Sequence, residues 1–408
     1  MWRLIFLLLF PLFFLAIPAQ GQAPETAALL VQPGDTWLAL SWRYGVSTAD
    51  LQTLNPHPNR QRQPVIGDTI RVPATAERLG KLDSGAMGGV LATAVRHGVS
   101  PWQVAWDNGL PSPSHPVLGR PLFIAVGDAP PRQLPPLFTS LELSHAQAYP
   151  GEGLAVRGEL TTAAWPSAQL TLGTAVGDVV TNGRRVVGLL GTGAFYQPGT
   201  PELSIKVAGQ PLWAQPWRMA ADKEWTYNQM TLTGTAAEIT DEAIAAERGR
   251  LMEIWNQTST PPQWTGSFQE PIANYLNYSS FYGARRSYNG GPYSTYHEGL
   301  DFSAYGGSDV LAPARGTVVV AEFLYVRGGA VIIDHGLGIY TGLYHLSGIL
   351  VDVGQVVEQG DVVGKVGSTG FSTGNHLHWD LLVSGEWVDP MAWRERDTAA
   401  WILAGWKE

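Results

Sequence analysis

The sequence predicts a multi-domain, mainly β protein. The chain has 408 residues, and at roughly 150 residues per domain this length favours about two to four domains. It contains 47 Gly and 29 Pro, a share above the average of globular proteins that is typical of chains rich in strands and turns. Hydrophobic residues make up 45%, which is enough for several cores and excludes disorder of the whole chain.

Charge and cysteine content exclude several classes of function. The formal net charge is −9 and no run of basic residues occurs, so binding to nucleic acid through phosphate contacts is not expected. The absence of Cys excludes disulfides, thiol nucleophiles and zinc sites built on Cys. Any metal ligand must therefore be a His or a carboxylate.

The N-terminal residues 1–21 are typical of a secretory signal peptide. Arg3 precedes an apolar stretch from Leu4 to Ile17, and small residues at Ala19 and Gly21 suit cleavage after Gly21. An uncleaved anchor is the alternative, although the apolar stretch is short for a bilayer. No later stretch reaches that length, so we expect an exported protein with no membrane span after signal removal.

Residues 29–75 predict a βααβ unit. A strand leads into a helix from about Thr36 to Tyr44 that Gly45 ends, and Ser47 caps a second helix before a closing strand. The segments Val31-Gln-Pro-Gly-Asp-Thr-Trp37 and Ile66-Gly-Asp-Thr-Ile-Arg-Val-Pro73 resemble a LysM domain. That resemblance implies binding to the glycan strand of peptidoglycan, with contacts at Gly34, Asp35, Thr36, Trp37 and Ile66.

The same pattern returns about 53 residues further along, which indicates an internal repeat. Gly98-Val-Ser100 matches Gly45-Val-Ser47, and Asn108 matches Asn55. This second unit, residues 80–126, lacks the Pro-Gly-Asp-Thr segment, so it resembles a degenerate LysM whose glycan binding stays open.

The middle of the chain predicts a Pro-rich linker, an Ig-like β-sandwich and a helical connector. The linker covers residues 127–136. Residues 137–233 hold short alternating segments divided by Gly and Pro turns, the spacing of a sandwich; their one His, His145, is expected to be structural. Residues 234–262 form the connector, with a helix over Thr240 to Asn256 that places Ile244, Leu251 and Ile254 on one face.

Five of the nine histidines lie between His297 and His378. His297 and Asp301 are four positions apart, and His376 and His378 are two apart. Because alternate residues of a strand share a face, each pair can point to the same side of a sheet. Three N and O donors with an open fourth position are typical of a catalytic zinc. The helical His-Glu-x-x-His motif is excluded, since Asp301 stands where its second His is required.

Residues Phe268 to Trp393 contain an ordered series of motifs that includes Ile333-Asp-His-Gly336, Tyr344-His-Leu-Ser347 and His376-Leu-His-Trp379. This series resembles the lysostaphin-like, or LytM-type, zinc metallopeptidases that cut peptidoglycan peptides. The resemblance implies an antiparallel β metallopeptidase domain over residues 263–395, followed by a C-terminal tail over 396–408. It also implies the site residues: His297, Asp301 and His378 as zinc ligands, and His345 and His376 as catalytic histidines.

The roles of His345 and His376 stay open at this point, and Tyr293 or Tyr296 is a candidate hydrogen-bond donor to the reacting carbonyl. The sequence thus predicts an exported, cell-wall-associated Zn²⁺ endopeptidase that hydrolyses peptide cross-links and is targeted to glycan by LysM. A non-enzymatic LytM-type regulator of a cell-wall amidase and a glycan-binding scaffold are the alternatives. The sequence does not identify which peptide bond is cut.

Overall fold

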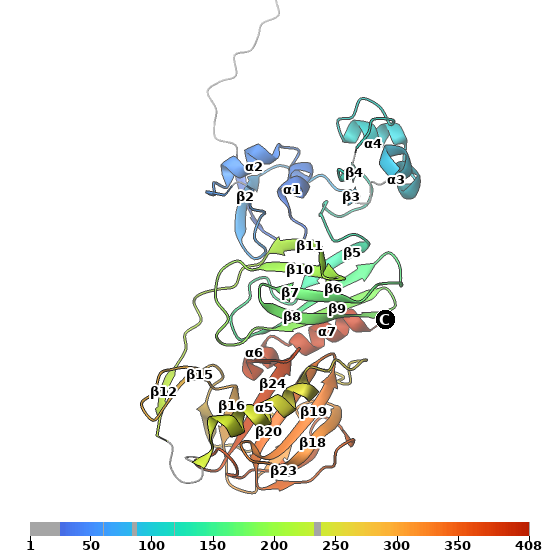
Figure 1. Ribbon diagram of the computed structural model, residues 1–408. Coiled ribbons are helices and arrows are strands. Elements are labelled where there is room, and N and C mark those ends of the chain that lie inside the picture. The colour runs from blue at the N-terminus through green and yellow to red at the C-terminus, as the bar shows by residue number, and fades with distance from the viewer. Residues whose placement is uncertain (1–24, 60, 84–87, 118, 232–237, 408) are drawn as a thin grey trace, which may run out of the picture.

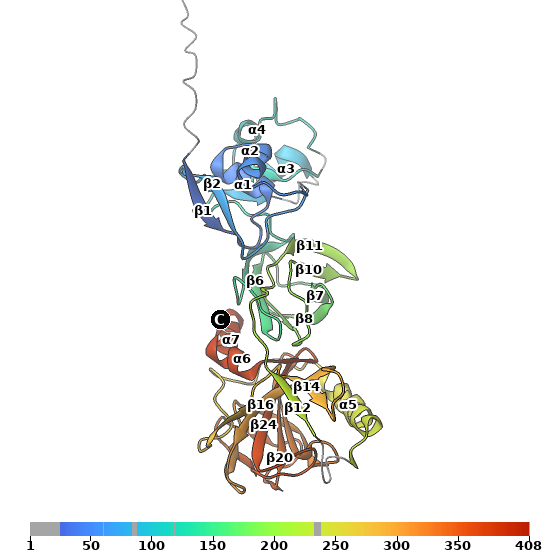
Figure 2. The same ribbon diagram turned by 90° about the vertical axis from the view of Figure 1, so that its left-hand side faces the viewer.

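The computed structural model describes residues 25–59, 61–83, 88–117, 119–231 and 238–407. The molecule is elongated, with two βααβ units at one end, a β domain in the centre and a larger β domain at the other end (Figures 1 and 2). The predicted signal peptide lies outside the described residues. Within these ranges, no helix is long and apolar enough to cross a membrane.

The first βααβ unit has the predicted order of elements. Thr36 accepts a hydrogen bond from the Ala39 amide at the start of the first helix, and Gly45 ends that helix in the left-handed conformation with φ 68°. Ser47 and Asp50 form a capping box at the second helix. The two strands pair antiparallel, and the elements are β1 (Thr26–Leu30), α1 (Trp37–Tyr44), α2 (Thr48–Leu54) and β2 (Thr69–Pro73).

The second unit has the same order of elements. Asn108 ties its second helix to the closing strand by accepting from the Phe123 amide and donating to the Phe123 carbonyl, and Asn55 makes the same pair of bonds to Arg71 in the first unit. The elements are β3 (Lys81–Asp83), α3 (Gly89–His97), α4 (Pro101–Asp107) and β4 (Leu122–Ile124).

The central domain differs from the predicted two-sheet sandwich. Its strands form one antiparallel sheet in the order β11-β10-β7-β8-β9-β6-β5. Phe138 on one edge strand and Trp213 on the other belong to the same buried cluster, so the sheet curls around a single core. The spacing of strands in the sequence does not distinguish a two-sheet sandwich from one curled sheet. The strands are β5 (Phe138–Leu143), β6 (Gly153–Leu160), β7 (Ala168–Leu172), β8 (Ala175–Asn182), β9 (Arg185–Gly191), β10 (Glu202–Val207) and β11 (Gln210–Pro216).

The connector helix is α5 (Asp241–Trp255), and the Thr240 side chain caps it by accepting from the Ala243 amide. Its buried residues are Leu251 and Trp255, and it lies across the C-terminal domain (Figure 1). The preceding strand, β12 (Tyr227–Met230), pairs with the C-terminal domain rather than with the central sheet. The central domain therefore ends earlier than the predicted boundary at residue 233.

The C-terminal domain is built on an eight-stranded sheet in the order β13-β16-β24-β20-β19-β18-β22, with β25 beside β24. Two three-stranded sheets, β17-β23-β21 and β12-β14-β15, complete it. Its strands are β13 (Asn277–Ser280), β14 (Arg285–Tyr288), β15 (Thr295–Tyr296), β16 (Gly299–Ser303), β17 (Asp309–Leu311), β18 (Gly316–Leu324), β19 (Gly328–Gly336), β20 (Ile339–Leu346), β21 (Gly348–Ile349), β22 (Val356–Val357), β23 (Val362–Lys365), β24 (His376–Val383) and β25 (Glu386–Val388).

The predicted C-terminal tail is instead a helix that joins two domains. After α6 (Pro390–Glu395), α7 (Thr398–Trp406) lies between the central and C-terminal domains in both views (Figures 1 and 2). Ile402 and Leu403 are buried in one cluster with Val187 and Leu189 of the central sheet. The helix starts after Asp397, whose side chain makes no capping hydrogen bond. Burial of its apolar residues, rather than capping, stabilises it.

His335, the histidine of the sheet that lies outside the cluster, has a structural role. It is fully buried, and its Nδ1 donates to the Arg315 carbonyl at 2.9 Å while Nε2 accepts from the Thr341 hydroxyl at 2.8 Å. Burial lowers the pKa of His335 to about 4. The ring therefore stays neutral in the folded protein at neutral and mildly acidic pH.

We expect His335 to make the protein less stable in acid. The unfolded chain takes up a proton near the ordinary pKa of about 6.5, whereas the folded chain does not until about pH 4. The unfolded state thus binds more protons in this window, and the free energy of unfolding falls by about 2 kcal/mol between pH 7 and pH 5 from this residue. Urea unfolding at pH 7 and pH 5 should show that the free energy of unfolding falls less in His335→Gln than in the wild type. An equal fall in both proteins would contradict the assignment.

Candidate metal centre

Strand pairing brings the predicted ligands together. In the antiparallel pair β16 and β24, Asp301 lies directly opposite His378. The neighbouring residues Phe302 and Trp379 are buried in the hydrophobic core, so the ligands point to the other face of the sheet. His297 follows β15 immediately. The even spacing of His376 and His378 therefore lies within one strand, β24, as expected, whereas His297 lies between β15 and β16, so its spacing from Asp301 is not a strand period.

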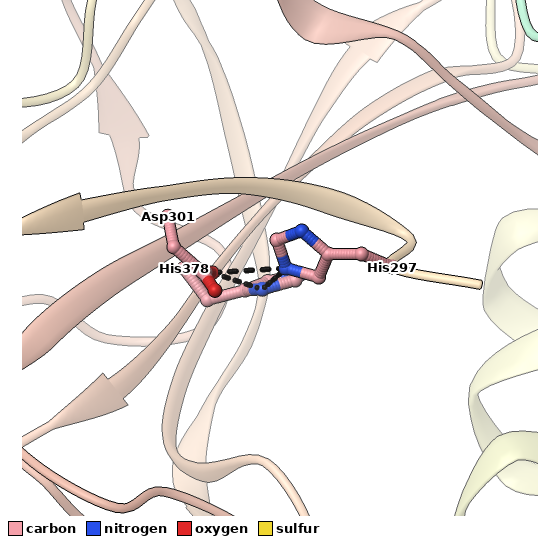
Figure 3. A group of neighbouring side chains, drawn as sticks. All are labelled: His297, Asp301 and His378. Carbon is pink, nitrogen blue, oxygen red and sulfur yellow. Dashed lines mark hydrogen bonds and ion pairs between the residues drawn. The ribbon is translucent and has the colours of Figure 1, made fainter. Parts of the chain in front are cut away.

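The three donor atoms converge on one point (Figure 3). Nε2 of His297 lies 3.0 Å from Oδ1 of Asp301 and 3.0 Å from Nδ1 of His378. The last pair, His378 Nδ1 and Asp301 Oδ1, is 2.8 Å apart. His297 is 2% exposed and Asp301 is 7% exposed, so the polar atoms gather in a largely desolvated place. Converging lone pairs of this kind fit a bound cation.

The protonation of these groups also fits a cation. Nδ1 of His297 lies 3.0 Å from the Phe281 carbonyl, so it carries the proton and leaves the Nε2 lone pair for a ligand. Burial lowers the pKa of His378 to about 4. Burial alone raises the pKa of Asp301, but His297 and His378 outweigh it and hold that pKa well below its usual range. A neutral imidazole and an ionised carboxylate are the forms that bind metals.

The structure places His345 and His376 beside this group. Their ring centroids are 4.7 Å apart, and Nε2 of His376 lies 3.9 Å from Oδ1 of Asp301. Nδ1 of His345 donates to the Thr369 carbonyl and Nδ1 of His376 to the Gly374 carbonyl, both at 2.8 Å. Each ring therefore keeps an Nε2 lone pair that can accept a proton.

His345 has an unusual backbone conformation. Its φ is 65°, in the left-handed region that non-glycine residues rarely adopt. The residue lies where the register between β19 and β20 shifts, between the pairs Val331–Leu343 and Gly329–Leu346. Such irregularities redirect a side chain and concentrate near functional sites. Burial, together with His376 and His378, lowers the pKa of His345 to about 3, so this ring is neutral at pH 7.

The tyrosine candidates do not join the cluster. The hydroxyl of Tyr296 is directed to Glu386 at 3.4 Å, and its ring contacts Phe195 of the central domain. Tyr293 packs against Tyr227 at a centroid distance of 5.2 Å. Neither contact is to a cluster residue, so the prediction of a Tyr donor receives no support from this arrangement.

Sequence reasoning missed several residues that support the cluster. The Ser280 hydroxyl lies 3.0 Å from Nδ1 of His297, and Nη2 of Arg286 lies 3.7 Å from Oδ2 of Asp301. The Tyr344 ring stacks on His378 with centroids 5.6 Å apart and planes 21° apart. Tyr344 is paired with His378 across β20 and β24, which a strand-pairing prediction could have found.

The predicted glycan contacts of the LysM unit are covered by other parts of the chain. The Gly34 amide donates to Gln215 of β11 at 2.9 Å, and the Thr36 hydroxyl donates to Gln133 of the linker at 2.9 Å. A bidentate ion pair between Asp68 and Arg218 also joins the two domains. In this arrangement all five residues are buried: Gly34, Asp35, Thr36, Trp37 and Ile66. Glycan contact through these residues therefore stays a prediction, and in this arrangement it requires the unit to separate from the central domain.

Comparison with known proteins agrees with this geometry. Residues 295–390 match Peptidase family M23, and residues 30–73 match the LysM domain. A segment of 98 residues is 43% identical to an uncharacterized metalloprotease of Haemophilus influenzae and covers 23% of this chain and 20% of that protein. A segment of 95 residues is 41% identical to the peptidoglycan DD-endopeptidase ShyA of Vibrio cholerae and covers 23% of this chain and 22% of that protein.

Among solved structures, the antimicrobial peptidase lysostaphin from Staphylococcus simulans is 30% identical, with 32% of this chain and 53% of that chain covered and a TM-score of 0.28. The chain matches about a fifth of the length of the two relatives named above. The chain contains a Peptidase family M23 domain that includes His297, Asp301 and His378, and an N-terminal LysM domain.

Proposed function

We propose that the protein is an exported, zinc-dependent endopeptidase that hydrolyses peptide cross-links of bacterial peptidoglycan. The observation that carries this proposal is the convergence of His297, Asp301 and His378 within an M23 domain, with two further histidines on the same face of the sheet. The peptidoglycan DD-endopeptidase among the relatives supports the substrate class. Residues 1–21 supply the proposed export signal.

The ion would be held by Nε2 of His297, Oδ1 of Asp301 and Nδ1 of His378. When bound, zinc supplies Lewis-acid chemistry, because it polarises a carbonyl and lowers the pKa of water. The chain itself moves the proton: Nε2 of His345 or His376 accepts it from the attacking water and returns one to the leaving amine. The Nδ1 bonds to Thr369 and Gly374 hold both rings in the tautomer that this transfer requires.

Digestion of purified peptidoglycan tests the proposal against its alternatives. An endopeptidase converts cross-linked dimeric muropeptides into monomers, so mass analysis of the products should show dimers disappearing when only this protein is added. A regulator would leave the dimers intact and act only when an amidase is also present. A glycan-binding scaffold would sediment with the wall and release no fragment. Intact dimers after prolonged incubation with the zinc-loaded protein would therefore refute the proposal.

We also propose that the LysM unit targets the protein to glycan after it separates from the central domain. Arg218→Glu places a carboxylate against Asp68 and replaces the bidentate pair with repulsion. A surface pair of this kind contributes up to about 1 kcal/mol, so the separated form should increase by roughly fivefold. Retention on insoluble peptidoglycan should rise accordingly and should persist in salt, because hydrogen bonds and stacking contribute the contacts.

Arg184→Glu is the matched control for this measurement. Arg184 forms an exposed pair with Glu159 inside the central domain, so its replacement changes the charge equally without loosening the LysM unit. We expect its retention to equal that of the wild type. Equal retention of Arg218→Glu and the wild type would contradict a competition between docking and glycan.

A further inference from the structure

We infer that helix α5, outside the matched M23 region, is part of the peptidase site, and that its Glu247 acts through Arg327 as a positioning residue for His345 and His378. The inference rests on the proposed function, because it assigns residues that support the same metal centre. It begins from a buried ion pair: the side chains of Arg327 and Glu247 are 10% and 8% exposed.

Glu247 fixes the turn between β18 and β19. Its carboxylate accepts hydrogen bonds from the backbone amides of Val326 at 2.8 Å and Arg327 at 3.2 Å. It also accepts from Nη1 of Arg327 at 3.0 Å. One carboxylate of the helix therefore sets both the backbone of the turn and the direction of the Arg327 side chain.

Arg327 connects Glu247 to the site through two contacts. Its carbonyl accepts from the His345 amide at 3.0 Å, which holds the backbone where His345 has its left-handed conformation. Its guanidinium lies 5.3 Å from the centroid of the Tyr344 ring, and that ring stacks on His378. A proposed catalytic histidine and a proposed metal ligand thus depend on the same arginine.

The next residue of the helix strengthens this connection. Arg248 pairs with Glu298, which follows the proposed ligand His297 in the chain, and Nη2 of Arg327 lies 3.9 Å from Oε2 of the same Glu298. The four charges alternate in sign from Glu247 through Arg327 and Glu298 to Arg248. Removal of one member of a buried ion pair leaves an uncompensated charge, and the pair of Glu247 with Arg327 is buried, so neutralising Glu247 should disturb residues that adjoin the cluster.

A simpler reading is that α5 only covers apolar surface, which Leu251 and Trp255 do. In that case Glu247 would affect stability and nothing else. The two readings differ in what they predict for the folded, metal-loaded protein, and this difference defines the experiment.

The experiment compares Glu247→Gln and Glu247→Ala with Glu253→Gln in the full chain. Glu253 is exposed on the same helix and is the matched control. Zinc affinity is measured by competition with a chromophoric chelator, and kcat and KM on cross-linked muropeptide are measured in saturating zinc. Outer partners of metal ligands typically contribute 10–100-fold to affinity or activity. We expect Glu247→Ala to lose about tenfold in zinc affinity and about tenfold in kcat, with KM within about twofold.

Glu247→Gln keeps an amide oxygen that can accept one of the backbone hydrogen bonds, so it should fold even if Glu247→Ala does not. We expect Glu247→Gln to show a smaller loss of zinc affinity and of kcat. Glu253→Gln should equal the wild type. The inference is overturned if folded Glu247 variants keep wild-type zinc affinity and kcat and only melt at lower temperature, or if KM alone changes. Failure of the wild type to cleave any muropeptide would refute the proposed function instead, while the zinc competition would still decide the inference.

Discussion

Replacing His378 with alanine is expected to remove stoichiometric zinc and reduce hydrolysis to background. Nδ1 of His378 lies within 3.0 Å of both other donor atoms, so its loss leaves two ligands, too few to hold the ion tightly. The partners lose their arrangement as well, because the carboxylate of Asp301 then keeps His297 as its one imidazole partner at 3.0 Å, with His376 at 3.9 Å. Metal content after dialysis and cleavage of cross-linked muropeptide are the two measurements.

His335→Gln is the control for this variant. It removes another buried imidazole from the same sheet, where His335 contacts Arg315 and Thr341 rather than the cluster. We expect it to retain one zinc per chain and wild-type activity at neutral pH. Stoichiometric zinc in His378→Ala would show that the ligand assignment is wrong.

Changes at His345 and His376 should separate activity from metal binding. We expect His345→Asn and His376→Ala to keep zinc and to lose about 10²–10⁴-fold in kcat, since proton transfer contributes this much to catalysis. Asn is preferred at His345 because it tolerates the left-handed backbone better than Ala does. The variant with the larger loss identifies the more important proton acceptor. A wild-type rate in either variant would exclude that residue from catalysis.

Local signals in the sequence predicted the elements that local interactions stabilise. The helix end at Gly45 and the cap Ser47 were found because capping depends on residues that are close in the chain. The closure of the central sheet and the docking of α7 could not be found this way. Both depend on contacts between distant segments, as when Arg157 donates to the Trp401 carbonyl.

The same distinction applies to the candidate site. The cluster residues were predicted because period-two spacing within strands and the resemblance to M23 motifs both point to them. Glu247 lies about 80 positions from Arg327 on a helix of ordinary amphipathic pattern, and no spacing rule connects the two. The burial of Gly34 and Ile66 was also missed, because a sequence does not show which surface of a small domain packs against its neighbour.

Zinc titration of the metal-stripped protein tests the central claim most directly. The protein is stripped with a chelator, zinc is returned in fractions of an equivalent, and the cleavage of cross-linked muropeptide is measured at each step. We predict no cleavage without metal, a linear rise in rate, and a plateau at one zinc per chain, as the group of His297, Asp301 and His378 requires. Full activity in the stripped protein, or no activity at any zinc concentration, would contradict the account.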